Sequence, residues 1–336
     1  MKTKIAINGF GRIGRIFFRH AFGHPDIDII AINDLGAPEN MAYLLKYDTV
    51  YGLYEKSVEV KGGMLMVDGK EIRIIQEKEP RLLPWKDLDI DVVVESTGVF
   101  ESREASTPHL SAGAKRVVIT APAKDEITPT ATPNVGEEFL KNDKITSNAS
   151  CTTNAVTPVM SVMAANPGVK KAVLNTIHAY TASQGLVDGP DKKDDFRRAR
   201  AAAQNIVPST TGAALAAIKA LPSLTGKFDG ISLRVPVVCG SIMDFTFIAA
   251  RPTSVEEINS IFKKASAEKH WQGILTVTEE PLVSSDIIKN PHGSIVDLMM
   301  TRVIDGDLVK VLAWYDNEWG YASTLLKHVL AVSKLL

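Results

Sequence analysis

The chain has 336 residues, of which 45% are hydrophobic and 23% are charged. These values are close to globular averages, and the length allows two hydrophobic cores, since a single core stops growing near about 250–300 residues. The formal net charge is −1, so no strong overall field draws the chain to nucleic acid or to a membrane surface. With only two cysteines, the composition argues against a disulfide framework and for a reducing compartment.

No segment predicts export or membrane insertion. The N-terminus becomes glycine-rich before an apolar signal region forms, and the longest uncharged stretch, Ile145–Val169, contains many Ser, Thr, Asn and Pro residues. No run approaches the roughly 20 apolar residues that span a bilayer. We therefore expect a soluble cytoplasmic protein without a membrane partner.

The first half of the chain alternates short β-rich runs with helical stretches. A helix is predicted over Arg12–Phe22, and strands are predicted over Lys4–Asn8, Ile27–Asn33, Val92–Glu95 and Arg116–Thr120. Continuous Val and Ile runs are typical of strands covered on both faces, which means a parallel sheet with crossover helices. Residues 1–150 are thus predicted to form an α/β domain, a Rossmann-type doubly wound parallel sheet.

The second half has longer strands whose residues alternate between apolar and polar. The pattern predicts a catalytic α+β domain over 151–317 with a mostly antiparallel sheet and helices on one face. Its predicted strands are Lys171–His178, Gly230–Val238, Ser241–Ala250 and Asp307–Tyr315. The long loop Ala179–Arg198 is expected to be functional or to form an interface. Residues 318–336 are predicted as a C-terminal helix that returns to the first domain.

A glycine-rich loop near the N-terminus indicates a dinucleotide site. The loop Gly9-Phe10-Gly11-Arg12-Ile13-Gly14 follows a strand and opens a helix. Its glycines allow a tight turn and close approach of the backbone to a pyrophosphate, and the helix N-terminus attracts phosphate. Asp34 closes the next strand about 20 residues on, where it can bind the ribose hydroxyls and repel a 2′-phosphate. We therefore predict NAD rather than NADP; the alternative is a structural turn with an exposed Asp.

One cysteine, Cys151, has the surroundings of a nucleophile. Ser150 is a good N-cap, so Cys151 falls in the first turn of a helix, where free N–H groups stabilise a thiolate and lower its pKa. Pro158 predicts a kink beyond that turn. The strand Lys171–His178 can return His178 to the cysteine, where the imidazole pairs with the thiolate and acts as a base. The alternative for His178 is an ordinary histidine at a strand end.

Two further segments indicate anion sites. The segment Pro208–Ala214 begins a predicted helix that runs to Leu221, and the N-terminus of this helix attracts phosphate. An ordinary N-cap explains the same residues. Arg234 lies inside an apolar strand and needs an anionic partner, for which a phosphate is suitable. Thr181 can donate a further hydrogen bond to that phosphate from its hydroxyl. The basic cluster Arg197–Arg200 is short and local, so nucleic acid is not expected as a main partner.

Together these segments resemble the phosphorylating glyceraldehyde-3-phosphate dehydrogenase family over essentially the whole chain. The matching segments are Ile7–Arg15, Glu95–Phe100, Ala149–Asn154, Ser209–Ala214, Arg234–Pro236 and Trp314–Glu318. The resemblance implies that Cys151 attacks the aldehyde of glyceraldehyde 3-phosphate to form a hemithioacetal. His178 accepts its hydroxyl proton while hydride passes to NAD. Inorganic phosphate then cleaves the thioester, giving 1,3-bisphosphoglycerate.

The resemblance also implies a role for each matching position. Ligands of the substrate phosphate are Thr181, Arg198 and Arg234, and those of inorganic phosphate are Ser150, Thr152, Thr211 and Gly212. The expected NAD contacts are Gly9, Gly11, Arg12, Ile13, Gly14, Asp34, Lys78, Thr97, Thr120 and Asn317, with Asn317 at the nicotinamide amide. No metal site is expected. The family is typically homotetrameric, with the long loop near a neighbour's cofactor.

Some positions depart from the family pattern, and two other functions stay open. The departures are Ala182-Ser183, the apparent insertion Lys289–His292, Lys78 in place of a frequent arginine, and Cys239 in place of a frequent Asn or Asp. Erythrose-4-phosphate dehydrogenase shares the Cys–His chemistry, but the intact Thr210–Ala214 segment favours the glyceraldehyde enzyme. A redox-sensing or RNA-binding protein on the same fold needs neither that segment nor Arg234.

Overall fold

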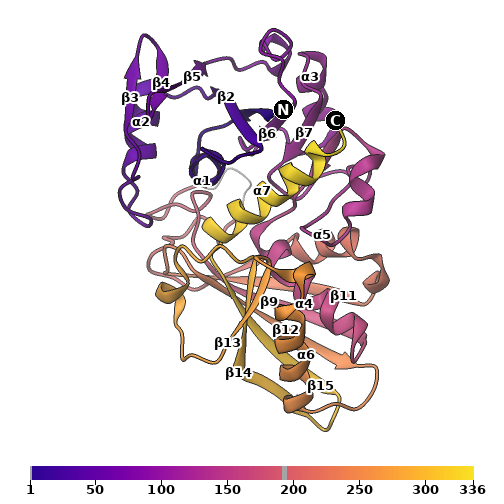
Figure 1. Ribbon diagram of the computed structural model, residues 1–336. Coiled ribbons are helices and arrows are strands. Elements are labelled where there is room, and N and C mark those ends of the chain that lie inside the picture. The colour runs from indigo at the N-terminus through magenta and orange to yellow at the C-terminus, as the bar shows by residue number, and fades with distance from the viewer. Residues whose placement is uncertain (1, 191–194) are drawn as a thin grey trace. The chain divides into compact units, whose positions relative to one another are not determined.

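The computed structural model describes residues 2–190 and 195–336, and the chain divides into two compact units. Unit 1 comprises Met1–Ala131, Gly136–Ala149 and Leu325–Leu336, whereas unit 2 comprises Thr132–Val135 and Ser150–Thr324. Figure 1 colours the chain by residue number, so most of unit 1 is indigo to magenta and most of unit 2 is pink to yellow. The last helix, α7 (Trp319–Ser333), begins in unit 2, and its second half belongs to unit 1.

Unit 1 is built on an eight-stranded sheet in the order β3-β4-β5-β2-β1-β6-β7-β8. The strands are β1 (Thr3–Asn8), β2 (Ile27–Asn33), β3 (Val58–Lys61), β4 (Met64–Val67), β5 (Lys70–Ile75), β6 (Val92–Glu95), β7 (Arg116–Ile119) and β8 (Ile145–Ser147). All neighbours from β5 to β8 are parallel, which confirms the predicted Rossmann-type sheet. The antiparallel extension β3-β4-β5 was not predicted, because its strands are short and one face is largely exposed.

The central strands of unit 1 are buried because their side chains are almost all Val, Ile or Ala. Every residue of β6 and β7 is buried, and Trp85, Ile90 and Ile145 pack into the same core. Helices of this unit are α1 (Arg12–Ala21), α2 (Pro38–Lys46) and α3 (Arg103–Ser111). The strand order reverses at β1, which has β2 on one side and β6 on the other. In parallel sheets of this kind, ligands bind beyond the carboxyl ends of the strands at that reversal.

Unit 2 is built on a seven-stranded sheet in the order β10-β11-β9-β12-β15-β14-β13. The strands are β9 (Val169–Ala179), β10 (Val207–Thr210), β11 (Phe228–Val235), β12 (Ser241–Ala249), β13 (Leu275–Thr278), β14 (Ser294–Ile304) and β15 (Leu308–Tyr315). Most pairs are antiparallel, as predicted. Two pairs are parallel, β9 with β11 and β13 with β14. A crossover that includes helix α5 separates β9 from β11 along the chain.

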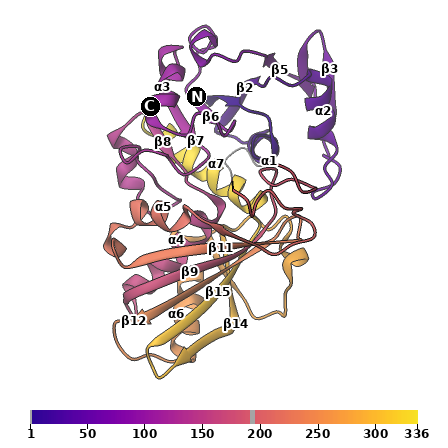
Figure 2. The same ribbon diagram turned by 180° about the vertical axis from the view of Figure 1, so that it is seen from behind.

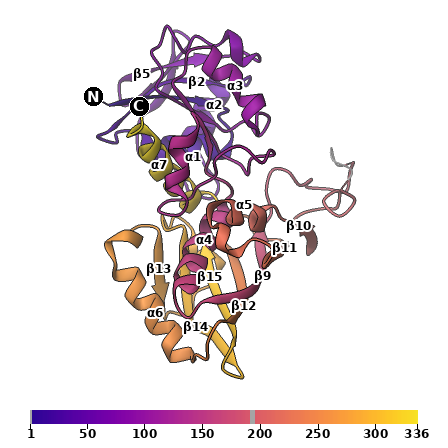
Figure 3. The same ribbon diagram turned by 90° about the vertical axis from the view of Figure 1, so that its right-hand side faces the viewer.

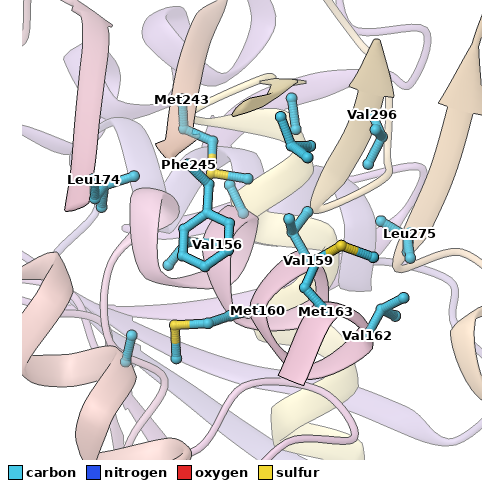
Figure 4. Close-up of a cluster of buried hydrophobic side chains, with 14 of the residues drawn as sticks. Val156, Val159, Met160, Val162, Met163, Leu174, Met243, Phe245, Leu275 and Val296 are labelled. Atoms are coloured by element: carbon cyan, nitrogen blue, oxygen red, sulfur yellow. The ribbon is translucent and has the colours of Figure 1, made fainter. Parts of the chain in front are cut away.

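Helices α4 (Cys151–Ala165), α5 (Ala213–Ala220) and α6 (Val255–Ala267) contribute to one core with the inward side chains of the sheet. Figure 1 shows α4 and α6 in front of the strands, and Figure 2 shows the opposite face of the sheet toward the viewer. In Figure 4, Val156 and Val159 of α4 lie among Phe245 of β12, Leu174 of β9 and Val296 of β14. This packing anchors α4 and therefore positions its first residue, Cys151.

The remaining helices and the long loop complete unit 2 and the connections. Short 3₁₀ helices in the described parts of the chain are η1 (Pro80–Leu82), η2 (Glu137–Asn142), η3 (Pro222–Leu224), η4 (Lys269–Trp271) and η5 (Ser284–Ile287). Between β9 and β10, residues 180–190 and 195–206 contain no helix or strand, and Figure 3 shows them as a loop that projects from the sheet. Part of the predicted loop Ala179–Arg198 lies outside the described residues. None of the described helices is long and apolar enough to cross a bilayer.

His328 on α7 is expected to make unit 1 sensitive to acid. Its Nε2 lies 3.0 Å from Thr146 Oγ1, and burial, opposed by the Ala131 carbonyl, lowers the pKa of His328 to about 4. The unfolded chain therefore takes up a proton near pH 6.5 while the folded chain does not, so unfolding becomes easier as pH falls toward 4. Between pH 7 and pH 5, we expect the wild type to lose about 2 kcal/mol more unfolding free energy than His328→Gln. Urea unfolding of both proteins at the two pH values measures this difference, and equal losses would contradict it.

Candidate active site

Cys151 and His178 lie next to one another in unit 2. Ser150 caps α4, because its Oγ accepts a hydrogen bond from Thr153 N at 3.1 Å, and Cys151 is the first residue of the helix. Strand β9 carries His178, whose Nε2 is 3.3 Å from Cys151 Sγ. The helix continues through Pro158 to Ala165. A nucleophile and a base are therefore within hydrogen-bonding distance at a helix N-terminus.

Arg234 lies against the other ring nitrogen of His178. The two residues are register partners in the parallel pair β9–β11, which brings their side chains together. Arg234 Nη1 is 2.7 Å from His178 Nδ1 and donates to Ala179 O at 3.1 Å. The guanidinium Nε is buried and has no hydrogen-bond partner among the described residues. An Arg with a spare buried donor suits an anionic ligand.

The structure places a neutral thiol beside a neutral imidazole. Burial raises the pKa of Cys151, although the Arg234 charge and the Thr152 amide act in the opposite direction. Burial, and then the Arg234 charge, lower the pKa of His178 to about 3. The expectation of a lowered cysteine pKa from the helix N-terminus was therefore wrong for this pair, because desolvation of the thiolate outweighs the helix amides.

Tyr315 contacts both Thr152 and the ring of His178, and it was not predicted from the sequence as a site residue. Its hydroxyl is 2.9 Å from Thr152 Oγ1 and 2.7 Å from Thr176 Oγ1, and its ring contacts that of His178 edge to face at 6.0 Å. Burial raises the pKa of the Tyr315 phenol, so it stays neutral. The available signal was the strict alternation of β15, which puts Tyr315 on the same inward face as Ala313.

The predicted phosphate ligands are only partly brought together. Arg198 donates to Ser209 Oγ from Nε at 2.9 Å and from Nη2 at 2.7 Å, and it lines a cavity of about 710 Å³ with Gly212. Thr211 instead lines a separate cavity of about 830 Å³, and its Oγ1 accepts from Ala213 N at 3.1 Å. Thr181 Oγ1 is 2.9 Å from Ser183 Oγ, so the departure at Ser183 contacts a predicted ligand.

Two other departures meet next to Asn317. Asp316 accepts a hydrogen bond from Cys239 Sγ at 3.3 Å and from Lys289 N at 2.9 Å. Asn317 Oδ1 accepts from Gly240 N at 3.1 Å and from Ser241 Oγ at 3.0 Å, which fixes the orientation of its amide. Cys239 is buried, so it behaves here as a small core residue that supports this turn.

Unit 1 has its own cavity, of about 480 Å³, at the carboxyl ends of the strands where their order reverses. It is lined by Asn8, Gly9, Gly11, Asn33, Asp34, Leu35, Glu77, Lys78, Glu79, Ser96, Thr97, Val99 and Phe100. Five of the ten predicted NAD contacts are therefore in one place, namely Gly9, Gly11, Asp34, Lys78 and Thr97. Arg12, Ile13, Gly14 and Thr120 do not line it, and Asn317 belongs to unit 2.

The glycine loop has the close contacts that its sequence predicts. A Cβ on Gly9, whose φ is +94°, would lie 2.6 Å from Thr97 N, and one on Gly14 would lie 2.2 Å from Gly9 O. A Cβ on Gly11 would meet no atom within 4 Å, so there the backbone faces open space. Two glycines are thus required by packing, and the third leaves room for a ligand to reach the backbone.

Asp34 and Arg12 have partners within unit 1. Asp34 accepts from Phe10 N at 2.6 Å and from Gly36 N at 2.8 Å, so the carboxylate is held beside the glycine loop. Arg12 forms an ion pair of 3.0 Å with Asp48, and its guanidinium lies over the Tyr51 ring. These contacts direct the Arg12 side chain to Asp48.

Comparison with known proteins identifies the family. Two protein-family models match the chain. Residues 3–103 match the NAD binding domain of glyceraldehyde 3-phosphate dehydrogenase, and residues 150–317 match its C-terminal domain. The chain is 49% identical to glyceraldehyde-3-phosphate dehydrogenase of Borreliella burgdorferi, over 96% of this chain and 97% of the relative. It is 46% identical to the enzyme of Geobacillus stearothermophilus, over 96% of both chains.

The fold and these matches define an NAD-dependent oxidoreductase with a Rossmann-type domain. The chain belongs to the glyceraldehyde-3-phosphate dehydrogenase family. This membership confirms the resemblance predicted from the sequence. In the described ranges, no group of three or more His, Cys, Asp or Glu side chains is arranged to hold a metal ion.

Proposed function

We propose that the protein oxidises glyceraldehyde 3-phosphate to 1,3-bisphosphoglycerate with NAD and inorganic phosphate, through a thioester on Cys151. The observation that carries this proposal is the 3.3 Å contact between Cys151 Sγ and His178 Nε2. It lies within the segment matched by the family's C-terminal domain model. Nucleophile and base side chains at this distance are the signature of covalent catalysis.

Two features of unit 1 support its cavity as the cofactor site. Gly11 leaves the backbone open to a pyrophosphate, and the N-terminus of α1, with its positive dipole end, lies next to it along the chain. The Asp34 carboxylate keeps lone pairs beyond those used by Phe10 and Gly36, which suits ribose hydroxyls and repels a 2′-phosphate. When bound, NAD supplies the hydride acceptor. Asn317 is the proposed contact of its nicotinamide amide.

In the first half-reaction, His178 moves protons for Cys151. The neutral pair allows the thiol proton to pass to His178 Nε2 as Sγ attacks the aldehyde carbon, and Arg234 and the Thr152 amide stabilise the thiolate. The imidazolium then protonates the new oxyanion to complete the hemithioacetal. As hydride leaves the carbon, His178 takes the hydroxyl proton back, and a thioester remains on Sγ.

In the second half-reaction, inorganic phosphate attacks the thioester carbon and the Cys151 thiolate leaves. Ser150, Thr152, Thr211 and Gly212 are the proposed ligands of that phosphate, and Thr181, Arg198 and Arg234 those of the substrate phosphate. Arg234 supports this assignment best, because its buried Nε has a donor to offer. Arg198 and Arg234 also repel each other, which an anion between cationic groups relieves.

A comparison of aldehydes tests the substrate. With NAD and phosphate, we expect NADH to form with a kcat/KM at least about 100-fold higher for glyceraldehyde 3-phosphate than for glyceraldehyde, because an Arg–phosphate pair contributes several kcal/mol. A higher kcat/KM with erythrose 4-phosphate would instead assign erythrose-4-phosphate dehydrogenase. Equal rates with and without the substrate phosphate would overturn the roles of Arg198 and Arg234.

The open face of the unit 2 sheet supports assembly with further copies. Figure 2 shows the face of the sheet that α4 and α6 do not cover. The exposed residues of its strands include Val173 of β9 and Ile231 of β11, whose side chains are 52% and 54% exposed. Exposed β-branched residues on a broad sheet face are typical of protein interfaces. We propose a cytoplasmic homotetramer, which sedimentation velocity tests directly.

A further inference from the structure

A buried carboxylate lies beneath the dinucleotide cavity. Glu95, the last residue of β6, is 1% exposed. Its Oε1 accepts from Thr97 N at 2.9 Å and from Thr97 Oγ1, whereas its Oε2 accepts from Asn8 Nδ2 and lies 3.1 Å from His109 Nε2. Four groups thus surround two oxygens, which is the full acceptor capacity of an ionised carboxylate. These hydrogen bonds offset the cost of burying the Glu95 carboxylate away from water.

Trp85 determines which nitrogen of His109 carries the proton. The Trp85 Nε1–H, which can only donate, is 3.0 Å from His109 Nδ1. Nδ1 must therefore be the acceptor, so the proton of the neutral ring is on Nε2 and points at Glu95 Oε2. His109 is completely buried on α3, and it does not line the cavity. Its contact is with the Glu95 carboxylate and not with the cavity itself.

Glu95 transmits this contact to one wall of the cavity. Thr97, held by Glu95, lines the cavity together with Ser96. Ser96 Oγ donates to Gly9 O at 2.6 Å, and Gly9 is packed against the backbone of Thr97 so closely that it cannot carry a side chain. The Glu95 carboxylate is therefore connected through Thr97 to the first glycine of the dinucleotide loop.

The same carboxylate is tied to the opposite wall. Asn8, which donates to Glu95, accepts at Oδ1 from Asn33 Nδ2 at 2.7 Å. Asn33 then pairs with the backbone of Glu77, donating to its carbonyl at 2.9 Å and accepting from its N–H at 2.9 Å. Asn33 and Glu77 both line the cavity. One hydrogen-bonded chain thus joins His109 to both walls.

We propose that His109 is a positioning residue for NAD, acting through Glu95 on the walls formed by Thr97, Gly9 and Glu77. This inference rests on the cofactor site proposed above. His109 holds the carboxylate in place by donating from Nε2, and Trp85 fixes the tautomer that makes this donation possible. The contact to Glu95, rather than burial of the ring, is what NAD affinity depends on.

Two matched amides at residue 109 separate this role from general packing. In His109→Gln the amide nitrogen falls near the former Nε2 and can still donate to Glu95, whereas in His109→Asn it falls near Nδ1 and cannot reach. By calorimetric titration of the full chain with NAD, we expect His109→Gln to retain affinity within about threefold. His109→Asn should bind at least about tenfold more weakly, because a hydrogen bond to a buried charge is lost.

The comparison is informative only beside thermal unfolding of the same variants. Similar melting temperatures with divergent NAD affinities support the positioning role, whereas equal affinities of the two variants, high or low, overturn it. If His109→Asn does not fold, Glu95→Gln is tested in its place. In Glu95→Gln the new amide NH₂ group faces N–H donors instead of accepting from them, so we expect this variant to bind NAD at least about tenfold more weakly. Unchanged affinity in that variant also overturns the proposal.

Two controls separate failure of this inference from failure of the cofactor site. Thr107→Ala changes an exposed residue on the same helix and should leave NAD affinity unchanged. Asp34→Ala removes the proposed ribose ligand, so wild-type affinity in that variant would show that NAD does not bind in this cavity. Loss in Asp34→Ala together with equal binding by both residue-109 amides would reject the role of His109 alone.

Discussion

Cys151→Ser is expected to abolish dehydrogenase activity, with a loss in kcat of about 10⁴-fold or more. A serine hydroxyl has a far higher pKa than a thiol, and an oxygen ester is a poorer acyl donor to phosphate than a thioester. NAD should bind with nearly wild-type affinity, because Cys151 is not among the residues that line the proposed cofactor cavity. Steady-state assays and NAD titration of the purified variant measure both quantities.

The second cysteine provides the matched control. Cys239→Ser makes the same chemical change at a buried residue whose sulfur donates to Asp316, and a serine hydroxyl can keep that hydrogen bond. Its kcat should stay within a few fold of the wild type. Comparable losses in the two variants would mean that the substitution acts through folding, and activity in Cys151→Ser would remove Cys151 from the mechanism.

His178→Asn is expected to lower kcat by about 10²–10⁴-fold, which is the usual contribution of a general base. Asparagine preserves polarity but cannot accept the thiol or hydroxyl proton. Since burial raises the pKa of Cys151, the thiol of the variant must lose its proton directly to solvent. Alkylation of Cys151 by iodoacetamide should therefore be slow at neutral pH in the variant and rise with pH until the raised pKa is passed.

The same alkylation measured on wild type and variant separates the two contributions of His178. At neutral pH the wild-type rate should exceed that of His178→Asn, because His178 Nε2 lies 3.3 Å from Sγ and accepts the proton. Identical pH profiles for the two proteins would show that His178 does not activate the thiol. A lower kcat would then have to arise at the hemithioacetal step alone.

Much of the fold could be predicted because local residue patterns determine it. The Val and Ile runs of β6 and β7 are buried on both faces, as such runs require. The glycine spacing at the start of α1 predicted the strand-loop-helix unit. In contrast, the parallel pairing of β9 with β11 depends on the path of a crossover, which no local pattern encodes. Strands β3 to β5 were missed because their residues are only half-buried.

The candidate site was predictable in its parts but not in its contacts. Cys151 and His178 were predicted from residue type and position, and the structure brings their side chains together. The contact of Arg234 with His178 Nδ1 arises from the register of β9 and β11, so the sequence alone could not predict it. Desolvation of Cys151 likewise depends on tertiary burial, which is why its pKa direction was predicted wrongly. The Glu95–His109 contact joins a strand end to a separate helix.

The central claim is that Cys151 carries the acyl group until phosphate removes it. The direct measurement is a rapid-mixing assay of NADH formation from glyceraldehyde 3-phosphate and NAD without phosphate. We predict a single burst with an amplitude of about one NADH for each Cys151, because the thioester then blocks the thiol, and steady turnover once phosphate is added. Steady turnover without phosphate, or a burst of the same size in Cys151→Ser, would contradict this account.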